Sequence, residues 1–384
     1  MPRFFAVTAL AATLALLGWR ALPPGAAPRV RASTTQIVRV GILLGQEAIP
    51  IAAEGAIEAG DVAAQTVLTL PPGTHEFRPT AQGIEGAGAR FGPVLRLRSA
   101  AGWLAAGPRR YRGVIELRRT SQGLAAINEL FVEEYLYGVL KMEVDPRWPA
   151  EALKAQAVAA RTLALYSLGR FAAEGYDLRA TTDSQVYAGI NAEDPRTTAA
   201  VDGTRGVIMT YAGRPIFAAF HADSGGFTES SEFVWGQPYP YLRGVPDPYG
   251  QDAPYREWLS RIDLPTLEAR LARAGRPLPG ISAVAVTATS PSGRALTVRL
   301  IGAGGTLELR AVDLRTILGV TFLRSTLFVV RPADDDSPAV EFQGRGSGHG
   351  VGMSQWGARG QAQLGRTYHD ILAFYYRGIQ LEAR

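Results

Sequence analysis

The stretch YLYGVLKMEVDPRWPAEALKAQAVAAR, residues 135–161, is the most informative part of this chain. It places an acidic residue, Glu143, shortly before a helix that begins with proline and carries Lys154, Gln156 and Arg161 among small apolar residues. The chain has only two lysines among its 40 basic residues, and both lie in this stretch. A carboxylic acid held near cations and amide groups is the arrangement that a general acid/base needs for a polar, hydroxyl-rich substrate.

A strand-rich region is predicted on the N-terminal side of this stretch, over residues 36–130. Short runs of apolar and β-branched residues alternate there with turn signals that contain proline and glycine. The predicted strands are IVRVGILL at 37–44, TVLTL at 66–70, PVLRLRS at 93–99 and GVIELRR at 113–119. A hairpin over 208–220 and a β-meander over 283–310 add strands further along the chain.

Helices are predicted where the apolar residues change to a helical period. The helix after Pro149 has its proline in the first turn, where the missing N–H costs nothing, and Gly169 is its predicted stop. A short amphipathic helix is predicted at 265–274, and Thr367 with Asp370 forms a T-x-x-D capping pair ahead of a last helix. The predicted fold class is therefore α+β, a strand-rich body with a few helices.

The composition describes a folded chain with a basic surface. With 384 residues, of which 47% are apolar and 20% charged, the chain is long enough for one large domain or two smaller ones. A net charge of +5 favours attraction to acidic polymers such as cell-wall glycans, nucleic acid or anionic lipid. Because the arginines are spread singly and form no basic runs, we do not expect nucleic acid to be a partner.

The N-terminus predicts export. A short basic lead precedes an almost unbroken apolar run at residues 4–17, and residues 19–28 are rich in alanine, proline and glycine. We therefore expect residues 1–30 to be a signal peptide or an N-terminal anchor, and the protein to be extracytoplasmic, in the cell wall or periplasm. We expect membrane contact only through this segment, if it is not cleaved. The chain has no cysteine, which excludes disulfides, a thiol nucleophile and cysteine-ligated metals.

Glu143 has two interpretations. Either it donates a proton to a leaving oxygen, with a pKa raised by partial burial, or it is a surface acid paired with a lysine. On the following helix, Lys154, Val158 and Arg161 fall on nearly one line at 3.6 residues per turn. That stripe is either an edge that faces a ligand or an ordinary charged outer face, and Gln156 points well away from it. Periodicity does not decide between these alternatives.

A second cluster, GRGSGHGVGMSQWGA at residues 344–358, has glycine at every second position from 344 to 352. Glycine removes side chains from one face of an extended segment and permits very close approach of the backbone to a ligand or to another strand. His349 projects from this segment, and Ser354, Gln355 and Trp356 follow it. Hydroxyl, amide and indole groups together suit carbohydrate binding, and we prefer this interpretation to a flexible glycine loop.

A third cluster, FHADSGGFTESSEFVW at residues 220–235, contains the DSGG sequence that surrounds the nucleophile of trypsin-like proteases. A serine hydrolase is therefore an alternative of a different class, although neither an alanine–histidine–cysteine setting nor a GxSxG elbow is present. His221 could ligate a metal with His349 or His369, but no pair has i,i+4 spacing. A serine-rich turn after a strand is the simplest interpretation, and we predict no metal and no cofactor.

Four long motifs occur in one order between residues 135 and 376. They are YLYGVLKMEVDPRWPAEALKAQAVAARTLA, TTDSQVYAGI, FHADSGGFTESSEFVWGQPYPYL and GHGVGMSQWGARGQAQLGRTYHDILAFYY. Together they resemble the stage II sporulation protein D family, also called the LytB amidase-enhancer family. The resemblance spans about residues 111–381, and we expect residues 131–384 to form the part similar to this family.

The resemblance implies a fold grooved around a glycan-binding cleft. Members of the family that have been studied as enzymes are lytic transglycosylases, which act on peptidoglycan glycan strands and prefer strands stripped of their stem peptides. Their catalytic acid occupies the position of Glu143. By the same resemblance, the residues that would contact the glycan are Lys154, Gln156, Arg161, Tyr187, His349, Ser354 and Gln355.

A lone glutamate suffices for this reaction. A hydrolase acting on a glycosidic bond normally needs two carboxylates at a set separation. In a lytic transglycosylase the C6 hydroxyl of the muramic sugar attacks its own anomeric carbon, so the substrate supplies the nucleophile. One residue can protonate the leaving oxygen and then accept the hydroxyl proton, while cationic and amide neighbours orient the sugar.

A second hypothesis of a different class is a noncatalytic wall-binding protein that stimulates an N-acetylmuramoyl-L-alanine amidase. The two hypotheses share every motif and differ in whether Glu143 is strictly required. Some members of the family bind zinc through cysteine and histidine near the segment equivalent to residues 220–230. This chain keeps His221 and has no cysteine, so we expect no metal there.

Overall fold

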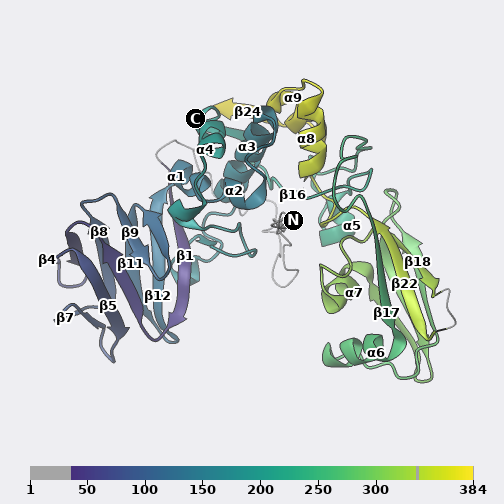
Figure 1. The fold of residues 1–384 in the computed structure, drawn as a ribbon, viewed down its shortest axis with the longest axis horizontal. Coiled ribbons are helices and arrows are strands. Elements are labelled where there is room, and N and C mark those ends of the chain that lie inside the picture. Colours follow the sequence, from purple (N-terminus) through teal and green to yellow (C-terminus); the bar gives the residue numbers. More distant parts are fainter. Residues whose placement is uncertain (1–35, 334–336, 384) are drawn as a thin grey trace, which may run out of the picture. The chain divides into compact units, whose positions relative to one another are not determined.

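The computed structural model describes residues 36–333 and 337–383, so the predicted export segment at 1–30 lies outside the described residues. These residues form two compact units, both drawn in Figure 1. The N-terminal unit comprises residues 36–147, 156–217 and 381–383, and the C-terminal unit comprises residues 148–155, 218–333 and 337–380. Strands outnumber helices, which confirms the predicted strand-rich α+β class.

Two sheets pack face to face in the N-terminal unit (Figure 1). In order, the first consists of β13 (Leu178–Arg179), β1 (Ile37–Gln46), β12 (Gly123–Phe131), β11 (Val114–Thr120), β8 (Val94–Ser99), β3 (Ile57–Asp61) and β4 (Thr66–Leu70). The second consists of β10 (Arg109–Arg112), β9 (Trp103–Ala106), β2 (Ile49–Ala53), β5 (Gly73–Pro79), β6 (Ile84–Gly86) and β7 (Ala89–Phe91). The strands predicted from the sequence in this region are β1, β4, β8 and β11.

Alternation along the strands explains this packing. In β8, Leu95 and Leu97 are fully buried while Arg96 and Arg98 are exposed, so one face of the first sheet is apolar and the other is charged. The apolar face packs against the second sheet and forms the core of the unit.

The remaining elements of the N-terminal unit follow β12 in the chain. The helical ones are α1 (Val132–Tyr137), α2 (Leu140–Glu143), α3 (Ala150–Tyr166), η1 (Ala172–Glu174), η2 (Gly189–Ala192) and α4 (Pro195–Asp202). A small sheet has the order β15 (Arg214–Pro215), β14 (Val207–Tyr211) and β24 (Gln380–Ala383). The predicted hairpin is present as β14 and β15, and the helix predicted after Pro149 is α3. The first turn of α3 belongs to the C-terminal unit, because residues 148–155 are part of it.

The C-terminal unit has three small sheets. They are β16 (Phe220–His221) with β23 (Met353–Ser354); β17 (Glu257–Asp263), β22 (Ala339–Arg345) and β21 (Phe328–Pro332); and β18 (Ala283–Thr289), β19 (Ala295–Gly302) and β20 (Gly305–Arg310). Its other helices are α5 (Ser231–Trp235), α6 (Leu264–Arg273), α7 (Ala311–Leu318), α8 (Gln355–Gln363) and α9 (Tyr368–Tyr375). The predicted meander at 283–310 is confirmed, and Thr367 and Asp370 form the predicted capping box of α9. No helix of the described ranges is long and apolar enough to cross a bilayer.

The glycine-rich segment 344–352 makes close contacts with other parts of the chain. A Cβ atom on Gly352 would lie 2.0 Å from the carbonyl oxygen of Ala219, and one on Gly348 would lie 2.7 Å from the Cβ of His221. Both glycines have a positive φ, +73° and +106°, which L side chains rarely adopt. Of the two explanations that the sequence left open for the alternating glycines, the structure shows close approach to another segment of the chain.

We predict that Gly352→Ala destabilises the protein more than Gly365→Ala does. Both glycines have a positive φ, which costs alanine about 1–2 kcal/mol, but nothing lies within 4 Å of a Cβ atom at Gly365. At Gly352 the added methyl also meets the Ala219 carbonyl, which adds about 1–3 kcal/mol of overpacking. Chemical denaturation of both variants measures the difference, and equal losses of unfolding free energy would contradict the contact.

Candidate functional site

Glu143 is the last residue of α2, and its carboxyl group is enclosed by protein. The chain leaves the helix at Val144, which is extended (φ −140°, ψ 153°). Both carboxyl oxygens are buried, although other atoms of the residue reach solvent. Burial raises the pKa of Glu143 from 4.5 to about 7, and a hydrogen bond from the Val186 N–H acts in the opposite direction. Glu143 can therefore hold or release a proton near neutral pH, as an acid that later acts as a base must do.

Tyrosine rings pack near Glu143 in the N-terminal unit. The ring centroids of Tyr135 and Tyr187 lie 5.0 Å apart, and both side chains are buried. The Tyr187 hydroxyl donates to the Asn128 amide oxygen at 2.7 Å, and burial raises its pKa well above the usual value. Tyr187, expected from the family resemblance to contact the glycan, is thus buried in the packing against Tyr135.

The stripe of Lys154, Val158 and Arg161 on α3 is not a charged outer face. Val158 and Arg161 are buried, with 0% and 1% of their surfaces exposed, and only Lys154 is half-buried. Gln156 is also buried, at 1% exposed. The outer-face interpretation assumed that these charges face solvent, and it fails because Arg161 has a buried partner that helical periodicity does not reveal.

That partner is Glu133 on α1. The Arg161 guanidinium forms two parallel hydrogen bonds with the Glu133 carboxylate, at 2.9 and 2.7 Å, and donates to the Val207 carbonyl at 3.1 Å. Glu133 also accepts the Gly206 N–H at 3.1 Å. This buried pair ties α3, α1 and the start of β14 together, and no sequence pattern marks Glu133 as its acidic member.

Lys154 lies in the C-terminal unit, where its ammonium group pairs with Glu151 at 2.7 Å. The other carboxylate oxygen of Glu151 accepts the Tyr368 N–H at 2.8 Å, which attaches the first turn of α3 to the start of α9. Nearby in the same unit, Trp148 meets the edge of Trp356, with ring centroids 5.1 Å apart. The tryptophan pair was not predicted as a site, although indole rings provide flat apolar surfaces of the kind that sugars contact.

His349 and His221 are neighbouring neutral imidazoles whose ring centroids lie 5.5 Å apart. Burial and the Arg315 and Arg294 guanidinium groups lower the pKa of His349 to about 3, and burial lowers the pKa of His221 well below its usual value. Val351 fixes both rings, because its N–H donates to His349 Nδ1 at 3.0 Å and its carbonyl lies 3.1 Å from His221 Nδ1. His349 therefore carries its proton on Nε2 and His221 on Nδ1.

Ser354 and Gln355 are both buried at the start of α8. The Ser354 hydroxyl caps the helix by accepting the Gly357 N–H at 3.1 Å, and it also accepts the Ser224 N–H at 3.3 Å. The two residues that the family resemblance assigns to glycan contact here are thus integrated into the packing of the C-terminal unit.

The DSGG cluster does not form a catalytic triad. Ser224 is fully buried and its hydroxyl accepts the Gly226 N–H at 3.1 Å, whereas His221 is directed to Val351. Asp223 is buried close to Asp247, and burial raises its pKa to about 6 although the Arg256 guanidinium lowers it. A serine hydrolase needs a histidine bonded to the serine hydroxyl, and this pair is not bonded.

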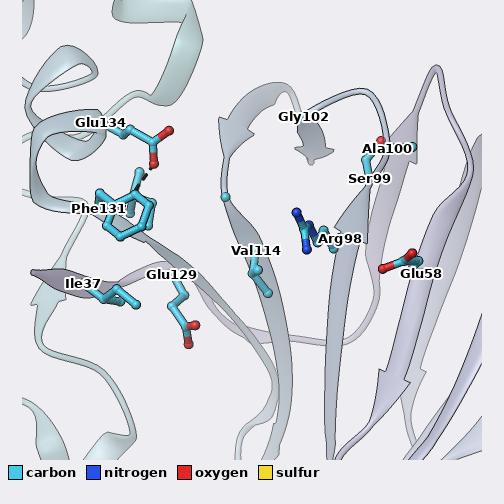
Figure 2. Close-up of a pocket in the computed structure, with 12 residues that line it drawn as sticks. Ile37, Glu58, Arg98, Ser99, Ala100, Gly102, Val114, Glu129, Phe131 and Glu134 are labelled. Atoms are coloured by element: carbon cyan, nitrogen blue, oxygen red, sulfur yellow. Dashed lines mark hydrogen bonds between the residues drawn. The ribbon is translucent and has the colours of Figure 1, made fainter. Parts of the chain in front are cut away.

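The predicted site residues line neither a metal cluster of the described ranges nor the pocket drawn in Figure 2. Within residues 36–333 and 337–383, no three histidine, aspartate or glutamate side chains gather so that they could hold a metal ion. Figure 2 shows a pocket of about 530 Å³ in the N-terminal unit, into which Arg98 points between Phe131 on one side and Glu58 on the other. None of the predicted site residues lines this pocket, and the predicted glycan-binding cleft stays a prediction.

Comparison with known proteins identifies the family. The family described as Stage II sporulation protein matches residues 120–211, and a domain of unknown function, DUF8618, matches residues 249–352. The chain is 37% identical over 272 residues to an uncharacterized protein of Brachyspira hyodysenteriae, covering 71% of this chain and 72% of that protein. It is 32% identical to stage II sporulation protein D of Bacillus subtilis, covering 67% of this chain and 76% of that protein. This chain belongs to the stage II sporulation protein D family.

The same family includes a protein named for a different role. The amidase enhancer of Bacillus subtilis is 29% identical over 291 residues, covering 64% of this chain and 40% of that protein. The family match contains Glu143, Lys154, Gln156, Arg161 and Tyr187, and all of its residues except 148–155 belong to the N-terminal unit. His349 falls in the match to the domain of unknown function.

We predict that Arg161→Leu lowers the free energy of unfolding by about 3 kcal/mol or more, because it leaves Glu133 charged, buried and unpaired. The double variant Glu133→Leu/Arg161→Leu should recover part of this loss. The control is Arg147→Leu, since the Arg147 side chain is 77% exposed and its pair with Asp145 lies at the surface. Urea denaturation tests this, and a loss no larger than that of the control would contradict a structural role for Arg161.

We predict that the change in the free energy of unfolding caused by Glu143→Gln, relative to the unmodified protein, is more favourable at pH 8 than at pH 4. The folded state binds the Glu143 proton more tightly than the unfolded state does, and this contribution is complete below pH 4.5 and lost as pH rises through about 7. The rise in pKa from 4.5 to about 7 corresponds to about 3 kcal/mol, the upper limit of the effect.

Glu151→Gln serves as the matched control for this measurement. Burial tends to raise the pKa of Glu151, but the Lys154 ammonium and the Tyr368 N–H outweigh it and lower that pKa. Its substitution should therefore have the opposite pH dependence, becoming less favourable as pH rises. Denaturation of both variants at several pH values provides the comparison. The same pH dependence in the two variants would show that Glu143 is not enclosed as described.

Proposed function

We propose that this protein is an exported peptidoglycan lytic transglycosylase with Glu143 as its general acid/base. Its substrate would be the bond between N-acetylmuramic acid and N-acetylglucosamine in denuded glycan strands, and its product an anhydro-muramic end. The observation that carries the proposal is the enclosed Glu143 carboxyl, whose pKa is raised to about 7. An acid of this kind is protonated often enough at neutral pH to donate, and basic enough after donation to accept.

In the proposed reaction one carboxyl group both donates and recovers the proton. Glu143 gives its proton to the glycosidic oxygen as the bond between that oxygen and the anomeric carbon breaks. The C6 hydroxyl of the muramic sugar then bonds to the anomeric carbon, and its proton passes to the Glu143 carboxylate. Because a general acid must touch the oxygen that it protonates, glycan binding has to displace the atoms that cover the Glu143 oxygens.

The relatives support a cell-wall role and also a second candidate function. One relative is a sporulation protein and another is named an amidase enhancer. The latter favours the alternative that this chain binds peptidoglycan without cleaving it and stimulates a cell-wall amidase. In that case the raised pKa of Glu143 would have no part in the function, and only the binding surface would matter.

We predict that Glu143→Gln abolishes the release of anhydro-ended fragments from denuded peptidoglycan, with at least about a hundredfold loss of rate, because general acid/base catalysis is removed. Mass spectrometry of the digest measures this, with Glu54→Gln, at an exposed position, as the control. Reducing-end sugars released by the unmodified protein would indicate hydrolysis instead. Cleavage retained in Glu143→Gln would refute the enzymatic role, and amidase stimulation retained without any cleavage would support the alternative.

A further inference from the structure

The segment 184–187, sequence SQVY, contacts Glu143 from a neighbouring part of the N-terminal unit. The Val186 N–H donates to the Glu143 carboxyl. The residue before it, Gln185, is buried with 3% of its surface exposed. A side chain amide is thus held in the interior one residue away from the backbone group that binds the acid.

Gln185 is bonded on one side and unbonded on the other. Its Oε1 atom accepts the hydroxyl of Tyr135 at 3.3 Å in the protein interior. Its Nε2 atom is buried and has no hydrogen-bond partner among the described residues. Buried amide donors are nearly always bonded, because water has been removed and nothing replaces it. An unbonded donor on the residue next to Val186, whose N–H binds the proposed catalytic acid, therefore requires an explanation.

Tyr135 is the group that holds this amide in place. It belongs to α1, is fully buried, and packs against Tyr187, whose own hydroxyl is bonded to Asn128. Burial and the neighbouring negative charge of Glu143 raise the pKa of Tyr135 far above its usual value, so its hydroxyl stays protonated. It donates a hydrogen bond to Gln185 Oε1. This electrostatic interaction places Tyr135 near Glu143, and Gln185 is hydrogen-bonded to Tyr135.

We propose that Gln185 is a positioning residue for Glu143, with its Nε2 group donating to the carboxylate once Glu143 has given up its proton. This inference rests on the proposed function. A protonated carboxyl in an enclosed place needs few donors, whereas the ionised form needs several. The Val186 N–H supplies one, and the free amide of Gln185, oriented by Tyr135, supplies another at the step in which the charge appears.

Other ionisable groups around Glu143 in this unit do not offer that stabilisation. Tyr135, on α1, is neutral, and Lys141, on α2 itself, is exposed. The short helix η2, which packs against α2, contributes glycine, isoleucine, asparagine and alanine and has no ionisable side chain. Neither Tyr135 nor η2 therefore supplies a cation to the charged acid.

The test is a titration of Glu143 itself, followed through its carboxyl carbon by NMR in the full chain. In Gln185→Leu, the affinity of Glu143 for its proton should rise about tenfold, because one donor to the ionised form is lost. Tyr135→Phe should move the titration in the same direction by less, since the amide is kept but no longer oriented. Gln122→Leu, at an exposed glutamine, should leave it unchanged.

Two further measurements keep the outcomes distinct. Gln185→Asn keeps the amide but shortens its reach, so it should behave like Gln185→Leu, and near-UV circular dichroism confirms that each variant is folded. On denuded glycan, Gln185→Leu should lower kcat with KM unchanged and move the alkaline limb of the pH profile to higher pH. An unaltered Glu143 titration, or a change in KM alone, would overturn the proposal. Because the titration does not depend on catalysis, it tests the role of Gln185 even if the protein shows no lytic activity.

Discussion

The hydrogen bond between the Val186 N–H and the Glu143 carboxyl is the interaction on which the rest of the N-terminal site depends. It brings together two segments that are distant in sequence, α2 and the SQVY segment, and it does so in a place from which water is largely removed. Enclosure favours the neutral acid, while a backbone donor favours the ionised one. Because the two effects oppose each other, the pKa of Glu143 settles near neutrality and the group can exchange a proton in either direction.

The scaffold around this bond is built from buried polar pairs as much as from apolar packing. The Arg161–Glu133 pair fixes α3 against α1, and α1 in turn carries Tyr135. A buried ion pair contributes little net stability, yet breaking it is costly, so it restricts the arrangement of these helices more than it strengthens it. In the C-terminal unit the same restriction comes from the glycines of 346–352, whose missing side chains let two backbone segments touch.

Local structure was well predicted from the sequence because it depends on short-range rules. Turn residues, the proline before α3 and the Thr367–Asp370 capping pair each determine conformation within a few positions, and the structure has them. The orientation of charged side chains could not be predicted in the same way. Periodicity did not decide the environment of Arg161, which depends on Glu133, 28 positions away. Gln185 was not predicted as a site residue for the same reason, because the orientation of its side chain depends on Tyr135, which is distant in sequence.

The pairing of β24 with β14 has a consequence for the order in which the protein can be completed. The last strand of the small sheet in the N-terminal unit is residues 380–383, and Glu382 accepts a hydrogen bond from Thr210 at 2.7 Å. Residues 218–379 are made between the two partners and belong to the other unit. During synthesis, the edge of β14 that pairs with β24 therefore stays unpaired until the whole C-terminal unit has been synthesised.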